Sequence, residues 1–219
     1  MDMTISISQK LKEVAPTLKL GILIADVTVT EHNDNLWSEI DAFVSKFDLE
    51  MSQIAELSAI QEARKAYRAL GKDPTRYRLS SDSLMRRIVK AKGLYKVNDI
   101  VDLNNLLSLQ SGHSIGTYDL DKLSGDIVYG IGQANEDYIG IGRGPLNIEG
   151  LPVLKDNNGS FGSATSDSER SMVSLNTKKI LMNIIAFDGD EQLEDWMSKA
   201  KVMLESHLAA KDIKLFVVE

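Results

Sequence analysis

The stretch from Val101 to Leu123, VDLNNLLSLQSGHSIGTYDLDKL, lies where the chain changes from helical to β-like periodicity. Residues before Gly112 mostly show the spacing of amphipathic helices. Residues after it form short apolar runs separated by Gly, Asp and Asn, which is typical of strands joined by turns. Because helices come mostly first and strands mostly later, the sequence predicts an α+β fold. We expect the helices, mostly in the N-terminal half, to pack on a mainly antiparallel sheet.

The N-terminal half begins with a strand and continues with helices. The segment Leu18–Val29, LKLGILIADVTV, is rich in aliphatic and β-branched residues and predicts a buried strand of the later sheet. Gly71 and Gly93 are the expected ends of two of the helices. The predicted helices are Asn35–Phe47, Met51–Leu70, a helix capped by Ser80 or Ser81 and running to Lys92, and Ile100–Leu109.

The C-terminal half contains most of the predicted strands. They are Asp126–Ile131, Tyr138–Ile141, Leu151–Leu154, Met172–Leu175 and Ile180–Phe187. An amphipathic helix, Glu191–Ala209, and a strand, Ile213–Val217, complete the chain. No internal repeat and no linker rich in Pro or Ser is visible, so we expect one domain over residues 1–219.

Charge is distributed very unevenly along the chain. The segment Arg64–Lys96 has eleven Lys and Arg and two acids, within a chain whose net charge is −7. The segment is therefore at +9 and the remainder at −16. Such a segment is either the binding surface for a polyanion or a solvated basic face that pairs with acids elsewhere in the chain.

Several kinds of chemistry are excluded or unsupported. The chain has no cysteine, which excludes disulfides, zinc ribbons and thiol nucleophiles. Its three histidines, His32, His113 and His207, lack a metal-binding spacing, so we expect neither a metal nor a cofactor. The N-terminus does not have the pattern of a signal peptide, and no apolar run is long enough to span a membrane. We therefore expect a soluble, cytoplasmic protein.

The stretch Val101–Leu123 resembles, without gaps, the VD-x-TN…G-x-P-x-HAFDLDKL segment of bacterial phenylalanyl-tRNA synthetase β chains. Upstream, the run Leu84–Arg87 and the turn that begins at Gly93 are similar to the helix and turn that precede this segment in that family. The resemblance covers about residues 18–187, ahead of the C-terminal helix and strand of residues 190–219. The matching positions are Val101, Asp102, Asn105, Leu109, Gly112, Asp119, Leu120, Asp121, Lys122 and Leu123.

This pattern looks like the B3/B4 domain, the editing module of that synthetase. The runs Ala66–Arg78 and Thr165–Arg170 look more like those of free-standing B3/B4 proteins. The resemblance implies a B3/B4-like fold and a pocket for the aminoacyl end of tRNA. It implies a free-standing, trans-editing deacylase that hydrolyses the ester of mischarged aminoacyl-tRNA, its transient partner. The oligomeric state stays open.

One position departs from the family pattern. The histidine of the HAFD motif falls on Gly116 in this chain. A glycine can only shape the backbone or admit a larger substrate. The alternative to a deacylase is therefore a non-catalytic module that binds tRNA or an amino-acid-like ligand. His113, three residues earlier, is a candidate replacement for the missing histidine.

The candidate catalytic groups are therefore Asp167, Glu169, Gly116 and His113. Either acid can bind the ammonium group of an amino acid or act as a general base. Backbone amides near Gly116 and Gly162 are candidate donors to an oxyanion. The candidate substrate-binding residues are Asn104, Asn105, Tyr118, Gly162, Ser163, Thr165, Ser168 and Arg170.

The candidate tRNA-binding residues come from the basic segment. Contacts of Lys and Arg with phosphates depend on salt and are largely independent of base sequence. Tyr67 and Tyr77 are the side chains expected to stack on a terminal adenine, although Tyr67 lies on the apolar face of its helix. The cations are Arg64, Arg68, Arg76, Arg78, Arg86, Arg87 and Lys90.

Overall fold

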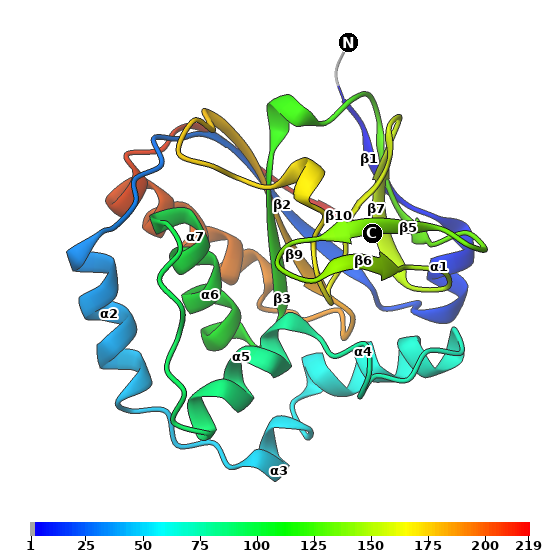
Figure 1. The fold of residues 1–219 in the computed structure, drawn as a ribbon, viewed down its shortest axis with the longest axis horizontal. Coiled ribbons are helices and arrows are strands. Elements are labelled where there is room, and N and C mark those ends of the chain that lie inside the picture. The colour runs from blue at the N-terminus through cyan, green and yellow to red at the C-terminus, as the bar shows by residue number, and fades with distance from the viewer. Residues whose placement is uncertain (1–2) are drawn as a thin grey trace.

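The computed structural model describes residues 3–219 and combines helices and strands in an α+β fold (Figure 1). The helices are α1 (Gln9–Val14), α2 (Asp34–Val44), α3 (Met51–Ile54), α4 (Ser58–Ala69), α5 (Ser80–Val89), α6 (Asp99–Ser111) and α7 (Leu193–Leu208), with 3-10 helices η1 (Leu120–Lys122) and η2 (Glu169–Ser171). The strands are β1 (Ile5–Ile7), β2 (Lys19–Asp26), β3 (Ser114–Asp119), β4 (Ile127–Ile131), β5 (Asp137–Gly140), β6 (Gly144–Asn147), β7 (Pro152–Asp156), β8 (Gly159–Gly162), β9 (Lys179–Ala186) and β10 (Lys211–Val218).

The central sheet has four antiparallel strands in the order β10-β2-β9-β3. Its inner strands are buried on both faces, and β9 reads KILMNIIA with one polar residue, Asn183, in its interior. Alternation of the side chains sends Leu20 and Ile22 of β2 into one core, and Leu23 and Ala25 into the other. The central sheet therefore separates two apolar cores.

Helices cover one face of the central sheet, and a second sheet covers the other. Helices α2, α6 and α7 lie together on the first face (Figure 1), where their apolar residues pack with those of the sheet. The second sheet has the order β1-β4-β7-β8, in which the β1–β4 pair is parallel and the others are antiparallel. Strands β5 and β6 form a separate hairpin. The expected antiparallel pairing is confirmed, although it is divided among two sheets and a hairpin.

The predicted helix Met51–Leu70 is interrupted in the structure. Helix α3 ends at Ile54 and α4 begins at Ser58. Between them, Leu57 has extended backbone angles, and its side chain packs against two different apolar clusters. A continuous helix would not place Leu57 between these clusters, so packing overrides the local preference for helix.

The ends of α5 differ from the prediction as well. Leu79, not Ser80 or Ser81, is its N-cap residue, and Ser81 is buried within the helix. At the other end, Ala91 has φ 52°, and the amide of Lys92 donates to the carbonyl of Arg87. This is a Schellman closure with alanine where glycine is usual, so the helix ends before Gly93.

The predicted strand Met172–Leu175 is the one expected strand that does not form among residues 3–219. Met172 makes a single bridge with Tyr118. The chain then turns, because the amide of Ser174 donates to the hydroxyl of Thr177. Strand β3, by contrast, was not predicted, and it places Gly116 and Tyr118 at the edge of the central sheet.

Candidate functional site

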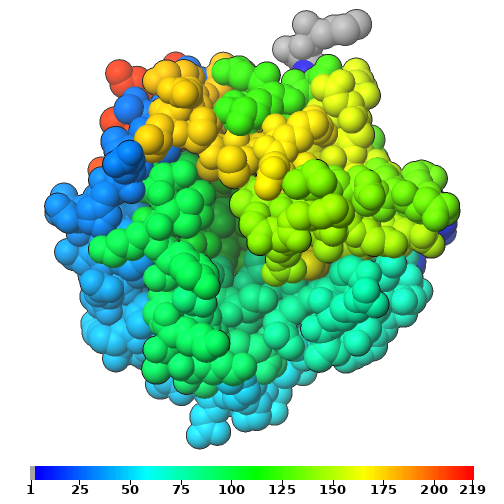
Figure 2. Space-filling view, in the orientation of Figure 1, coloured from blue at the N-terminus to red at the C-terminus, as the bar shows by residue number. Residues whose placement is uncertain are grey.

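A cavity of about 570 Å³ lies between α5, the loop after it, the loop after β8 and the β5–β6 hairpin. Figure 2 shows the surface hollowed between the green segment that includes α6 and the yellow-green hairpin. Six cations line this pocket, whereas Asp167 is the one carboxylate among its described lining residues. The cations are Arg78, Arg86, Arg87, Lys90, Lys92 and Arg143.

A buried carboxylate organises the cationic wall. Asp82, in the first turn of α5, is fully buried and accepts hydrogen bonds from Arg64 at 2.7 Å and Arg86 at 2.5 Å. Arg78 lies 3.7 Å from the same carboxylate. One negative charge therefore holds three guanidinium groups, and the cluster keeps an excess of positive charge at the pocket.

Arg87 is fixed by the loop that follows α5. Its guanidinium donates to the carbonyls of Gly93 at 2.5 Å and Lys92 at 3.2 Å, and to the hydroxyl of Tyr95 at 2.9 Å. Its central carbon lies 3.7 Å from the centre of the Tyr95 ring. These bonds attach the loop to α5 at the edge of the pocket.

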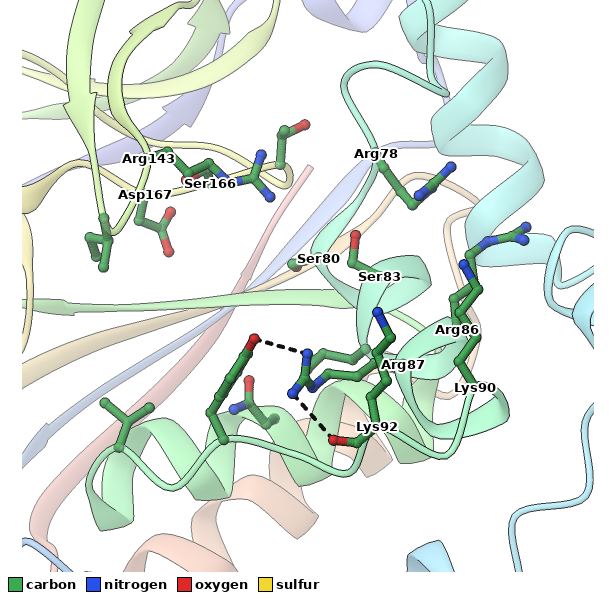
Figure 3. Close-up of a pocket in the computed structure, with 16 residues that line it drawn as sticks. Arg78, Ser80, Ser83, Arg86, Arg87, Lys90, Lys92, Arg143, Ser166 and Asp167 are labelled. Carbon is green, nitrogen blue, oxygen red and sulfur yellow. Dashed lines mark hydrogen bonds between the residues drawn. The ribbon is translucent and has the colours of Figure 1, made fainter.

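Asp167 lies next to Ser166 and Arg143 and faces the cations of α5 and its flanking loops across the pocket (Figure 3). Its Oδ1 accepts a hydrogen bond from the hydroxyl of Tyr118 at 2.9 Å and one from the amide of Ser163 at 3.2 Å. Its Oδ2 accepts none within the described chain. Burial raises the pKa of the Asp167 carboxyl to about 6, although both hydrogen bonds favour the ionised form.

Tyr118 occupies the space that the two neighbouring glycines leave open. A Cβ atom on Gly116 or on Gly162 would overlap the Tyr118 phenol, which also packs edge-on against Phe161 at 4.9 Å. Burial, and next the charge of Asp167, raise the pKa of Tyr118 well above its ordinary value, so its hydroxyl stays a donor. The expectation that Gly116 admits a larger substrate is therefore wrong, because the tyrosine fills that space.

Three backbone amides of the loop that carries Asp167 donate hydrogen bonds within the loop. The amide of Ser163 donates to Asp167, and those of Thr165 and Ser166 donate to the hydroxyl of Ser163. These amides are not available to an oxyanion in this conformation. The pocket's positive charge, including that of Arg143, comes instead from side chains.

The other sequence-predicted residues divide between the pocket and the scaffold. Asn105 and Thr165 line the pocket. Asn104 instead links α6 to β3, through bonds to the Ile115 carbonyl at 3.0 Å and the Thr117 hydroxyl at 2.8 Å. Ser168 caps η2.

Three charged candidates lie outside the pocket lining. His113 is buried and bonds to Asp188 at 3.1 Å through its Nε2. Arg170 forms two hydrogen bonds with Asp156, at 2.9 and 3.1 Å, and one with the Gly159 carbonyl. Glu169 is exposed in η2. The structure therefore places Asp167, and not these groups, at the pocket.

The predicted cations separate in a similar way. Arg78, Arg86, Arg87 and Lys90 line the pocket, and Arg64 supports it through Asp82. Arg68 and Arg76 are exposed and are not among its lining residues.

Neither of the two tyrosines expected to stack on a base is among the pocket's lining residues. Tyr67 is fully buried, and its hydroxyl lies 3.0 Å from that of Thr165. The Tyr77 ring has Lys72 and Arg76 at 5.2 and 5.6 Å from its centre.

The lining residues that sequence reasoning missed include Lys92, Tyr95 and Arg143. Lys92 belongs to the basic segment, so charge alone could have identified it. Arg143 lies far from that segment in the sequence, near the tip of the β5–β6 hairpin, and only the fold brings it close.

Across residues 3–219, no cluster of three or more His, Asp or Glu could hold a metal ion. Within the same range, no helix combines the length and apolar character needed to cross a membrane.

Comparisons with known proteins address the fold and the family. No curated protein matches this chain. Among solved structures, it is similar to an N-terminal fragment of the phenylalanyl-tRNA synthetase beta subunit from Pyrococcus horikoshii, with a TM-score of 0.52 and 13% identity. That alignment covers 100% of this chain and 51% of the fragment, so the chain spans about half its length. A scan of protein families matches the B3/4 domain to residues 62–200, which is more than half of the sequence. The chain therefore belongs to the B3/4 domain family.

Proposed function

We propose that this protein is a trans-editing deacylase, which hydrolyses the ester bond of mischarged aminoacyl-tRNA. The observation that carries the proposal is the placement of one half-buried carboxylate, Asp167, opposite a wall of cations in one pocket. Membership of the B3/4 domain family and the fold shared with part of a phenylalanyl-tRNA synthetase subunit support it.

The cationic wall fits the substrate's phosphates. Arg78, Arg86 and Lys90 present positive charge at the pocket, where they can neutralise phosphate oxygens without reading base sequence. Outside the basic segment the chain is at −16, which disfavours extended contact with RNA. We therefore expect transient engagement of an RNA end rather than of a long duplex.

Asp167 fits the role of general base. With a pKa of about 6 it is mostly ionised at pH 7.5, yet more basic than an ordinary aspartate. In the proposed step, the oxygen of a water molecule attacks the ester carbonyl carbon while Asp167 takes one of its protons. The bond between that carbon and the ribose oxygen then breaks, and the ribose oxygen receives the proton from Asp167. The products are a free amino acid and uncharged tRNA.

The test is deacylation of a panel of mischarged tRNAs, with correctly charged tRNAs as controls. We expect rapid release from at least one mischarged species. We expect Asp167→Asn to slow that release by about a hundredfold or more, as loss of a general base does. Glu169→Gln is the matched control, because this exposed carboxylate lies two residues away and is not among the pocket's lining residues. Release at the rate without protein, across the whole panel, would contradict the proposal.

The second candidate function is a non-catalytic binding module. The observation that favours it is that three amides of the Asp167 loop are used internally, and no histidine is among the described lining residues. A binding module would retain affinity for tRNA that falls with salt, without turnover. Measuring affinity and release on the same samples separates the two functions.

A further inference from the structure

Tyr95 is the most exposed of the large apolar side chains in residues 3–219, and 66% of its surface is accessible. Scattered exposed apolar residues are common on protein surfaces and need no explanation. Tyr95, however, shares the pocket with two others, Val97 at 55% and Ile141 at 40%. These three side chains come from the loop after α5 and from the turn between β5 and β6, and all three line the pocket.

The Tyr95 ring is held in place from one side. The Arg87 guanidinium lies 3.7 Å from the ring centre and also donates to the Tyr95 hydroxyl at 2.9 Å. Two more bonds tie Arg87 to the carbonyls of Lys92 and Gly93 in the same loop, and one of them is drawn in Figure 3. The ring is therefore oriented before any ligand arrives, and its exposure leaves surface for a further flat group.

A flat ring beside several cations matches one chemical class of ligand. Nucleobases stack on aromatic side chains whatever their identity, while Lys and Arg neutralise the neighbouring phosphates. A base inside a duplex already has neighbours on both faces, so only an unpaired nucleotide can use such a ring. Arg87 contacts Tyr95 directly and Lys92 lines the same pocket, and both supply positive charge.

We infer that Tyr95, backed by Arg87, is the stacking platform for the unpaired nucleotide at the 3′ end of an RNA. This inference rests on the proposed function, since it assigns a base-binding subsite to the same pocket. It replaces Tyr67, which is buried in the core, and Tyr77, which is not among the pocket's lining residues.

The test uses uncharged RNA hairpins with an unpaired 3′ end whose last base is the fluorescent analogue 2-aminopurine. Stacking on Tyr95 should quench this fluorescence. We expect Tyr95→Leu to abolish the quenching and to raise Kd about tenfold or more, whereas Tyr95→Phe retains both. Phe216→Leu is the control, because Phe216 is 38% exposed on β10 and is not among the pocket's lining residues.

A second arm removes the terminal base and leaves its ribose phosphate. Wild-type protein should bind this abasic hairpin more weakly than the intact one, while Tyr95→Leu should bind the two equally. A free 2-aminopurine nucleotide that binds as tightly as the hairpin would overturn the assignment to an RNA end. Equal quenching by wild type and Tyr95→Leu would overturn the role of Tyr95.

These outcomes are separable from those of the deacylation panel. Quenching that depends on Tyr95, without turnover of any mischarged tRNA, would support the platform and reject the hydrolase. Turnover that is unaffected in Tyr95→Leu, with no quenching in wild type, would support the hydrolase and reject the platform. If both hold, Tyr95→Leu should raise KM with little change in kcat, since the ring lies on the loop after α5 and Asp167 on the loop after β8.

Discussion

The ionisation of Asp167 predicts two pH dependences, one of the protein's stability and one of the deacylation rate. Its pKa is raised from 3.8 to about 6 by burial. Between pH 4 and 6 the folded protein therefore keeps a proton that the unfolded chain has lost, and the stability due to this group declines as pH rises. Asp167→Asn removes that decline. We expect the variant to gain stability relative to wild type from pH 4 to 6 and to keep the gain above pH 6.

Chemical denaturation at a series of pH values measures this difference. Other carboxylates titrate in the same range, so only the difference between the two proteins is informative. A difference that stays constant from pH 4 to 7 would show that the pKa is not raised. In wild type, the same ionisation predicts a deacylation rate that rises with pH and levels off above about 6.

Gly116 supports the same carboxylate indirectly. Gly116→Ala would push its Cβ into the Tyr118 phenol and disturb the hydroxyl that bonds to Asp167. Overpacking of this kind costs about 1–3 kcal/mol. Gly130→Ala, in strand β4, is the control because its new Cβ would have no neighbour nearer than 3.5 Å. Denaturation midpoints should fall for the first variant and stay unchanged or rise slightly for the second. Equal effects would contradict the close packing of Tyr118 on Gly116.

These residues also show how far the sequence could predict the site. Asp167 was identifiable because it lies in a loop of hydroxyl-bearing and charged residues whose pattern resembles a known family. The role of Tyr118 was not, because it depends on a side chain that folds back over Gly116 and across to Gly162. Arg143 was missed for a related reason, since only tertiary folding brings the β5–β6 hairpin to α5.

At the scale of elements, α4, α5 and the segment between them depend on Asp82. The fully buried carboxylate contacts arginines from all three, namely Arg64, Arg78 and Arg86. Asp82→Asn would leave three guanidinium groups close together without a counter-ion. Breaking a buried ion pair from one side costs about 3–5 kcal/mol, so we expect a loss of about 3 kcal/mol in the free energy of unfolding.

Equilibrium denaturation at neutral pH measures this loss. Glu62→Gln provides the comparison, because Glu62 pairs with Lys65 on the surface at 3.2 Å, where side-chain exposures are 39% and 75%. Such a pair contributes about 0–1 kcal/mol. A loss no larger for Asp82→Asn than for Glu62→Gln would show that Asp82 does not hold the cluster together.

The sequence predicted whether a segment is a helix or a strand more accurately than it predicted where each helix or strand ends. Apolar runs identified β2 and β9, and helical patterns identified α6 and α7, because burial of one or both faces determines which residues must be apolar. The break at Leu57 and the end of α5 at Ala91 depend instead on tertiary packing and on backbone hydrogen bonds. Neither leaves a local signal, and both residue types favour helix.

At the scale of the whole molecule, the fold concentrates positive charge at one pocket of an acidic protein. The open question from the sequence was whether the basic segment binds a polyanion or pairs with acids elsewhere. The structure gives a mixed answer: Arg64, Arg78 and Arg86 pair with Asp82 inside the segment itself, while Lys90 and Lys92 are exposed at the pocket.

This arrangement predicts a salt dependence that belongs to particular residues. If the pocket holds the phosphates of an RNA end, the logarithm of affinity should fall linearly with the logarithm of salt concentration. For single strands the slope changes by about 0.7 for each phosphate neutralised. Lys90→Ala should therefore weaken binding and make the slope shallower by about that amount. Lys211→Ala, which removes an exposed cation on the edge strand β10, should leave the slope unchanged.

Titrations of labelled RNA hairpins at four or five salt concentrations measure both slopes. Equal slopes for wild type and Lys90→Ala would mean that this lysine neutralises no phosphate. Equal changes of slope in both variants would mean that RNA binding depends on the net charge of the protein and not on the pocket.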